Sequence, residues 1–165
     1  MRSRLQSFWF VLALLACSLS GMAQLPPADP APCNAHPKFR FTVSGSPSMV
    51  LNSLTDFLNP QSVTFSIDVE SNNNSYKVYV AGVVTGLTGV ETTPIPLTSF
   101  TVSATNPGGS QSQPVTLGES YKMVVAAGKV KNRVHQITLT RAALPDFTQA
   151  PGTHTVLLHI RICQD

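Results

Sequence analysis

The stretch PGTHTVLLHIRIC, residues Pro151–Cys163, decides the fold that we expect for this chain. Its apolar side chains at alternate positions are Val156, Leu158, Ile160 and Ile162. This is the period of a β-strand with one buried face. Pro151 and Gly152 favour a turn before it, because proline presets φ and glycine tolerates a positive φ. A buried strand at this point must pair with strands formed much earlier in the chain.

Shorter runs with the same alternation occur along most of the chain, between clusters of glycine, proline and asparagine. Only the segment 53–58 suits a single helical or irregular turn. The candidate strands before the last one lie at 39–43, 49–51, 63–69, 76–80, 100–102, 115–117, 121–125 and 135–139. Short strands with turn residues between them are typical of sandwiches. We therefore predict an all-β fold, an immunoglobulin-like or jelly-roll β-sandwich of about seven to nine antiparallel strands.

Three connections carry specific expectations. The strands Val63–Val69 and Tyr76–Val80 form a candidate hairpin around Asn72–Asn74, because asparagine tolerates left-handed backbone. The segment Val83–Pro96 is rich in Gly and Thr and ends in Pro-Ile-Pro, so we expect it to be extended but not central in a sheet. Gly128–Asn132 is predicted to be a polar connection between two strands.

The N-terminal residues 1–23 have the pattern of a secretory signal peptide. Two arginines precede the short apolar run Phe8–Ala16, which is too short to span a membrane well. Gly21 and Ala23 then fit a cleavage site, so the exported chain would begin at Gln24. We expect no transmembrane segment in the mature chain.

An alternative treats Leu14–Cys17 as a lipoprotein signal, with Cys17 as the lipidated residue. Both interpretations export the chain, to the medium, the cell surface or the periplasm. The residues after the leader divide into a proline-rich arm at 24–37 and a β-sandwich domain at 38–165. Because the arm holds five prolines, which cannot donate ladder hydrogen bonds, we expect a monomer rather than a strand-exchanging polymer.

Charge and cysteine content fit an exported protein. Removing the two leader arginines from eleven Lys and Arg leaves nine against eight Asp and Glu, so the mature chain is nearly neutral. No basic run predicts a nucleic-acid partner. Cys33 and Cys163 remain, and an even pair in an exported chain predicts a disulfide. The bridge would bring the start of the first strand to the end of the last, so these strands would be antiparallel neighbours.

The titratable residues form no catalytic or metal-binding pattern, so we predict a non-enzyme without cofactors or metals. His154 and His159 are five positions apart on one strand and therefore point to opposite faces. His135 is in phase with apolar neighbours, which favours a hydrogen-bonded core histidine over a metal ligand. Asp68 and Glu70 share a strand end, where we prefer a solvated pair to a weak calcium site.

Several runs together resemble bacterial exported β-sandwich modules of the spore-coat-protein-U and pilin-like type. The runs are Val63-x-Phe65-x-Ile67-x-Val69, Ser71-Asn72-x-x-x-Tyr76, Ile95-Pro96-Leu97, and Phe147 to Val156 with its Pro-Gly-Thr before the last strand. The resemblance implies a role in surface appendages, coats or adhesion rather than in catalysis, with other surface or appendage proteins as partners.

Two functions follow as expectations. The first is an exported, non-catalytic β-sandwich with a structural or adhesive role at the cell surface or in an appendage. The second is a secreted or periplasmic module that binds a small ligand or glycan through a surface formed by Tyr79, His135 and Asp68. A hydrolase is disfavoured because the sequence places no nucleophile beside a base.

Overall fold

The computed structural model describes residues 33, 39–45, 49, 54–88, 95–105, 111–144 and 153–165. The predicted leader, its cleavage site between Ala23 and Gln24, and the alternative lipidation site Cys17 lie outside the described residues. Of the proline-rich arm, the described part contains only Cys33. The predicted division of the chain at these points stays a prediction.

Within the described ranges, seven strands form one sheet in which every pairing is antiparallel. The strands are β1 (Arg40–Ser44), β2 (Gln61–Thr88), β3 (Phe100–Thr105), β4 (Gln111–Ser112), β5 (Val115–Thr116), β6 (Lys122–Arg141) and β7 (Thr153–Gln164). A single helical turn, α2 (Leu54–Leu58), and a 3₁₀ turn, η1 (Leu97–Ser99), accompany them. The prediction of an antiparallel all-β fold is confirmed. The finer prediction of an immunoglobulin-like or jelly-roll sandwich stays a prediction.

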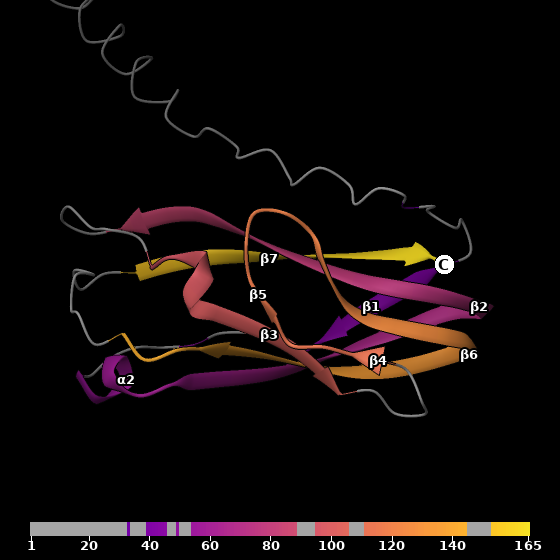
Figure 1. Ribbon diagram of the computed structural model, residues 1–165, viewed down its shortest axis with the longest axis horizontal. Coiled ribbons are helices and arrows are strands. Elements are labelled where there is room, and N and C mark those ends of the chain that lie inside the picture. The colour runs from indigo at the N-terminus through magenta and orange to yellow at the C-terminus, as the bar shows by residue number, and fades with distance from the viewer. Residues whose placement is uncertain are drawn as a thin grey trace, which may run out of the picture.

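The two longest strands, β2 and β6, turn back on themselves at the same end of the molecule (Figure 1). Asn72 and Asn73 make the bend in β2 with φ values of 49° and 66°. Asparagine is among the few residues other than glycine that adopt this backbone readily. Buried Ser71 donates a hydrogen bond to the Val130 carbonyl of β6, and the Asn74 amide donates to the Ser71 carbonyl at 2.9 Å. The bend is therefore held by side chains as well as by the backbone.

The β2–β6 pair is thus a two-stranded ribbon folded in half. In the first half, residues 61–70 of β2 pair with 132–141 of β6, and in the second half residues 74–80 pair with 122–130. β1 and β3 widen the first half, on the β2 and β6 sides respectively, and β5 pairs with β3. β7 and β4 widen the second half, β7 by pairing with β2 and β4 by pairing with β6.

The apolar faces of the two halves meet in one core. The first half contributes Phe65, Ile67 and Val69, and the second contributes Tyr76, Val78 and Val80, each with at most 3% of its surface exposed. The alternating apolar residues of β7 pack against this core; they are Val156, Leu158, Ile160 and Ile162. The predicted inner face of the last strand is therefore confirmed, although these side chains are only partly buried.

Two predicted connections are wrong. Val63–Val69 and Tyr76–Val80 do not form a hairpin with each other, because both pair with β6. The 20-residue β6 follows β2 around the bend, so Gly128–Asn132 belongs to a strand rather than to a connection. Val83–Thr88, predicted to be extended but not central in a sheet, is the end of β2, and its ladder partners are all on one side, in β7.

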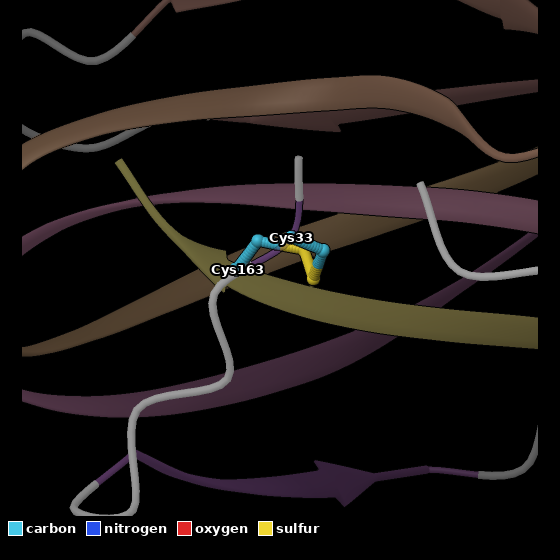
Figure 2. The surroundings of a disulfide bond; sticks show 2 residues. All are labelled: Cys33 and Cys163. Atoms are coloured by element: carbon cyan, nitrogen blue, oxygen red, sulfur yellow. A yellow bond between two sulfur atoms is a disulfide. The ribbon is translucent and has the colours of Figure 1, made fainter. Parts of the chain in front are cut away.

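Cys33 and Cys163 form the predicted disulfide (Figure 2). Their Cα atoms are 5.0 Å apart across a sequence separation of 130 residues. β1 and β7 run in opposite directions, as expected (Figure 1). They are not neighbours in the sheet, however, because β1 pairs with the first half of β2 and β7 with the second half. The bridge therefore ties the segment before β1 to the second half of the folded ribbon.

Candidate functional site

The three residues predicted to form a ligand surface lie apart. His135 is completely buried, whereas Asp68 is exposed on the opposite face of the first half. Tyr79 is half-buried in the second half, opposite Met123 on β6 and Arg161 on β7. The ligand surface proposed from the sequence is therefore wrong in its residues, because burial removes His135 and the ribbon fold separates the other two.

His135 is instead one member of a buried pair with Tyr76. The Tyr76 hydroxyl and His135 Nε2 are 2.6 Å apart, and the two rings meet edge to face with centroids 5.8 Å apart. Both side chains are fully buried. Tyr76 belongs to the second half and His135 to the first, so this hydrogen bond crosses the core between the halves. The interpretation of His135 as a hydrogen-bonded core histidine is confirmed.

The pair is uncharged over a wide range of pH. Burial lowers the pKa of His135 to about 4, and the positive charge of Arg133 acts in the same direction. Burial is also the main reason that the pKa of Tyr76 is raised to about 12. Of the nearby charges, Arg133 lowers this pKa and Asp68 raises it. Both groups are therefore neutral at physiological pH.

The hydrogen-bonding pattern fixes the direction of the bond. His135 Nδ1 is buried and, in the part of the chain that the structure describes, has no hydrogen-bond partner. If Tyr76 donates to Nε2, one group stays unpaired, the Nδ1–H. If Nε2 donates to Tyr76, both the tyrosine hydrogen and the Nδ1 lone pair stay unpaired. Because each buried unpaired group costs free energy, we assign Tyr76 as the donor.

Arg141 is a second buried polar group, at the end of β6. Its guanidinium donates to the carbonyls of Asp56, Phe57 and Asn59, with distances of 3.4 Å to Phe57 and 3.0 Å to Asn59. The group also lies 5.9 Å from the centre of the Phe57 ring. Carbonyls at a helix C-terminus have no partner within the helix. Arg141 therefore anchors α2 to β6, which is a structural role that the sequence did not indicate.

The outward face of the first half is rich in hydroxyl groups and carries no charge over most of its area. Three cross-strand pairs join β2 to β6: Ser62 with Thr140 at 2.9 Å, Thr64 with Thr138 at 3.0 Å, and Ser66 with Gln136 at 3.2 Å. The registers of β1, β3 and β5 extend these rows across five strands. We call the following set the hydroxyl face: Ser44, Ser62, Thr64, Ser66, Thr101, Ser103, Thr105, Thr116, Gln136, Thr138 and Thr140.

The sequence held a signal for the hydroxyl face that we did not use. Small hydroxyl residues alternate with buried apolar ones along each of the three central strands. In β2, for example, Ser62, Thr64 and Ser66 alternate with residues that pack on the core. The repeated alternation of Ser or Thr with apolar residues is therefore the pattern that predicts this face.

The acidic pair Asp68 and Glu70 lies exposed beyond the hydroxyl face, next to the bend. Among the described residues, no group of three or more His, Cys, Asp or Glu side chains is arranged to hold a metal ion. Of the other histidines, His159 is half-buried on β7, and His36 and the side chain of His154 lie outside the described residues.

Within the described ranges, no helix has the length and apolar character needed to cross a membrane. No family model, curated protein or solved structure matches this chain. A functional assignment therefore rests on the geometry of the sheet and its faces.

Proposed function

We propose that this chain is an exported, non-catalytic module with a structural or adhesive role at the cell surface, and that the hydroxyl face is its contact surface. We further propose that the two halves of the ribbon form an immunoglobulin-like or jelly-roll β-sandwich. The observation that carries the proposal is the array of uncharged, mostly hydroxyl side chains across five strands, with the Lys122 ammonium at its β5 edge.

The hydroxyl face suits a neutral partner that is itself rich in hydroxyl groups, such as a surface polysaccharide. Each Ser or Thr hydroxyl donates one hydrogen bond and accepts others. Short side chains lose little rotamer entropy on binding, and the pair of Thr64 with Thr138 is already held in place by its own hydrogen bond. A face without charges also avoids the cost of desolvating ions when it meets a neutral surface.

The buried polar groups support a non-catalytic role. Tyr76 and His135 are shut away from solvent and bonded to each other, and Arg141 is occupied by backbone carbonyls. A catalytic acid or base must reach its substrate. The disulfide supports export, since such bonds persist in oxidising compartments. The alternative of a small-ligand module around Tyr79, His135 and Asp68 is not favoured by the positions of these residues.

The test measures binding of the purified, oxidised protein to insoluble neutral polysaccharides, with cellulose and chitin as probes, in a sedimentation assay. A lysine in the middle of the hydroxyl face should weaken binding, so we expect Thr64→Lys to lose at least about tenfold in affinity. Ser120→Lys adds the same charge at an exposed position outside the face and should bind as the wild type does. Equal binding by wild type and Thr64→Lys, or no wild-type binding to either probe, would overturn the proposed contact surface.

A further inference from the structure

The Tyr76–His135 pair lies beside the least buried strand of the sheet. The ring of Phe39 packs edge-on against Tyr76, with centroids 6.3 Å apart and an interplanar angle of 75°. Phe39 leads directly into β1, where every residue is exposed, including Phe41 at 48% and Val43 at 41%. We call residues Phe39–Ser44 the strap. Phe39 packs on the core and Phe41 and Val43 are half-exposed, so Phe39 is the main apolar anchor of the strap.

Tyr76 is the point where several elements converge. Its hydroxyl contacts His135 in the first half, and its ring receives Phe39 from the strap. On the backbone it pairs with Gln164 of β7, next to Cys163 and the disulfide. A change in the position of Tyr76 would therefore disturb its contacts with the strap, with the end of β7 and with the first half.

A proton on His135 is incompatible with this arrangement. A protonated imidazole carries two N–H groups, and Nδ1 already lacks an acceptor in the described part of the chain. The second N–H, at Nε2, would have to use the Tyr76 oxygen as its acceptor, which would leave the tyrosine hydrogen unpaired. The positive charge would also be buried without a carboxylate to pair with it, which is costly.

The charged residues around the pair include both signs, and Arg133 is the one that acts on His135. Arg133, two residues before His135 on β6, repels a second positive charge. Asp68 of β2 acts on Tyr76 and is exposed to solvent. The strap brings Arg40 to the position opposite Glu70. On β7, the residue after Gln164 is Asp165, which forms an ion pair with Lys77.

We propose that the Tyr76–His135 pair is an acid-sensitive clasp. On acidification the pair separates and the strap leaves β2, while the disulfide keeps Cys33 attached to β7. This conformational response goes beyond the proposed adhesive function and does not depend on it. The released strap would expose the edge of the first half of β2, including the ladder positions of Val69 and Ile67.

The direction of the pH dependence follows from the two states. In the closed state burial holds the pKa of His135 at about 4, whereas a solvated histidine has a pKa of 6.5. The open state therefore binds the proton more readily. The clasp is fully stable above pH 6.5 and weakens as the pH falls toward 4. One proton is taken up on opening, so the open population rises by up to about tenfold for each pH unit in this window.

The experiment is hydrogen exchange, read by mass spectrometry on the oxidised full-length mature protein between about pH 7 and 4.5, corrected for intrinsic exchange rates. We expect the protection of strap peptides to fall by at least about tenfold between pH 6.5 and 4.5. Peptides from the end of β6, around Ile137 and Leu139, should stay protected. Simultaneous loss of protection in both regions would show global unfolding and would overturn the clasp.

Two variants separate the clasp from a general acid effect. His135→Gln retains an amide that can accept the Tyr76 hydrogen bond but does not titrate, so strap protection should become independent of pH. His159→Gln removes a half-buried histidine of β7 and should keep the wild-type response. An unchanged acid response in His135→Gln would refute the proposal.

A measurement on the wild type covers the case in which His135→Gln does not fold. The ¹⁵N chemical shifts of the imidazole nitrogens report the protonation of each histidine directly. The proposal requires the midpoint for His135 to lie below the ordinary value of 6.5, because the closed state disfavours the proton. A midpoint at or above 6.5 would show that closing does not disfavour the proton, and would refute the proposal.

Discussion

The two halves of the folded ribbon bury their residues in different ways. Along β2 in the first half, buried Phe65, Ile67 and Val69 alternate with exposed or half-buried polar residues. In the second half the alternation stops after Val80, because the run from Val80 to Val83 is buried at every position. The first half thus has one face in solvent. The second half is buried on both faces along this run, which is the burial pattern of an interior strand.

Gly82 shows how closely the second half is packed. A Cβ atom at this position would lie 2.6 Å from Cδ2 of Leu117 and 2.9 Å from Cδ2 of Leu97. These distances are shorter than carbon atoms tolerate, so any larger residue at Gly82 would displace the side chains of Leu97 and Leu117. The Gly82 N–H donates to the Gly118 carbonyl at 2.8 Å, which fixes the same approach through the backbone.

The largest expected effect comes from removing the disulfide between Cys33 and Cys163, which ties the segment before β1 to the second half. The Cys33→Ser, Cys163→Ser double variant should lose up to about 4–5 kcal/mol of unfolding free energy, because a loop of this length greatly restricts the unfolded chain. This is a large part of the net stability of a small domain. Denaturant unfolding of the oxidised protein and the variant measures the difference.

The bridge itself can be checked separately. Titration of free thiols in the denatured, unreduced protein should find none from Cys33 and Cys163. Two reactive thiols per chain would contradict the bridge and the placement of the strap that depends on it.

The second prediction compares the outward faces of the two halves directly. Neither Val83 nor Thr64 belongs to the core cluster, but Val83 has only 4% of its surface exposed, whereas Thr64 is exposed. Val83→Lys should cost about 3 kcal/mol or more, because it buries a charge without a partner. Thr64→Lys should change stability by no more than about 0.5 kcal/mol. Similar costs for the two variants, by chemical denaturation, would mean that the halves do not differ as described.

This difference between the halves explains which elements the sequence revealed. The strand 63–69 was predicted within a few residues, because one buried face and one solvated face produce a visible period of two. The end of β2 was missed, because residues buried on both faces leave no alternation to read. A register shift between Val78 and Tyr79 hides the pattern on β6 as well. Strict alternation would put Met123 inside, yet it is 41% exposed while Val124 and Val125 are both buried.

The candidate site was predicted in part. The burial of His135 followed from its phase with Ile137 and Leu139, but its partner could not be identified, since Tyr76 is 59 residues away and lies across the bend. The disulfide was predicted because only two cysteines remain after the leader. Local propensity and alternation describe one strand at a time. They therefore could not show that β6 stays paired with β2 on both sides of the bend.

The smallest expected effect tests whether the hydroxyl face serves stability. The hydrogen bond between Thr64 and Thr138 is exposed to solvent, so water can replace either partner. Thr64→Val and Thr138→Val should each change the unfolding free energy by less than about 0.5 kcal/mol, and valine also favours strands. A double-mutant cycle should give a coupling energy of about 0.5 kcal/mol or less for this cross-strand pair. A small coupling fits a face retained for contact with a partner. A coupling well above 1 kcal/mol would instead show that the hydroxyl rows hold the first half together, as the buried run does in the second.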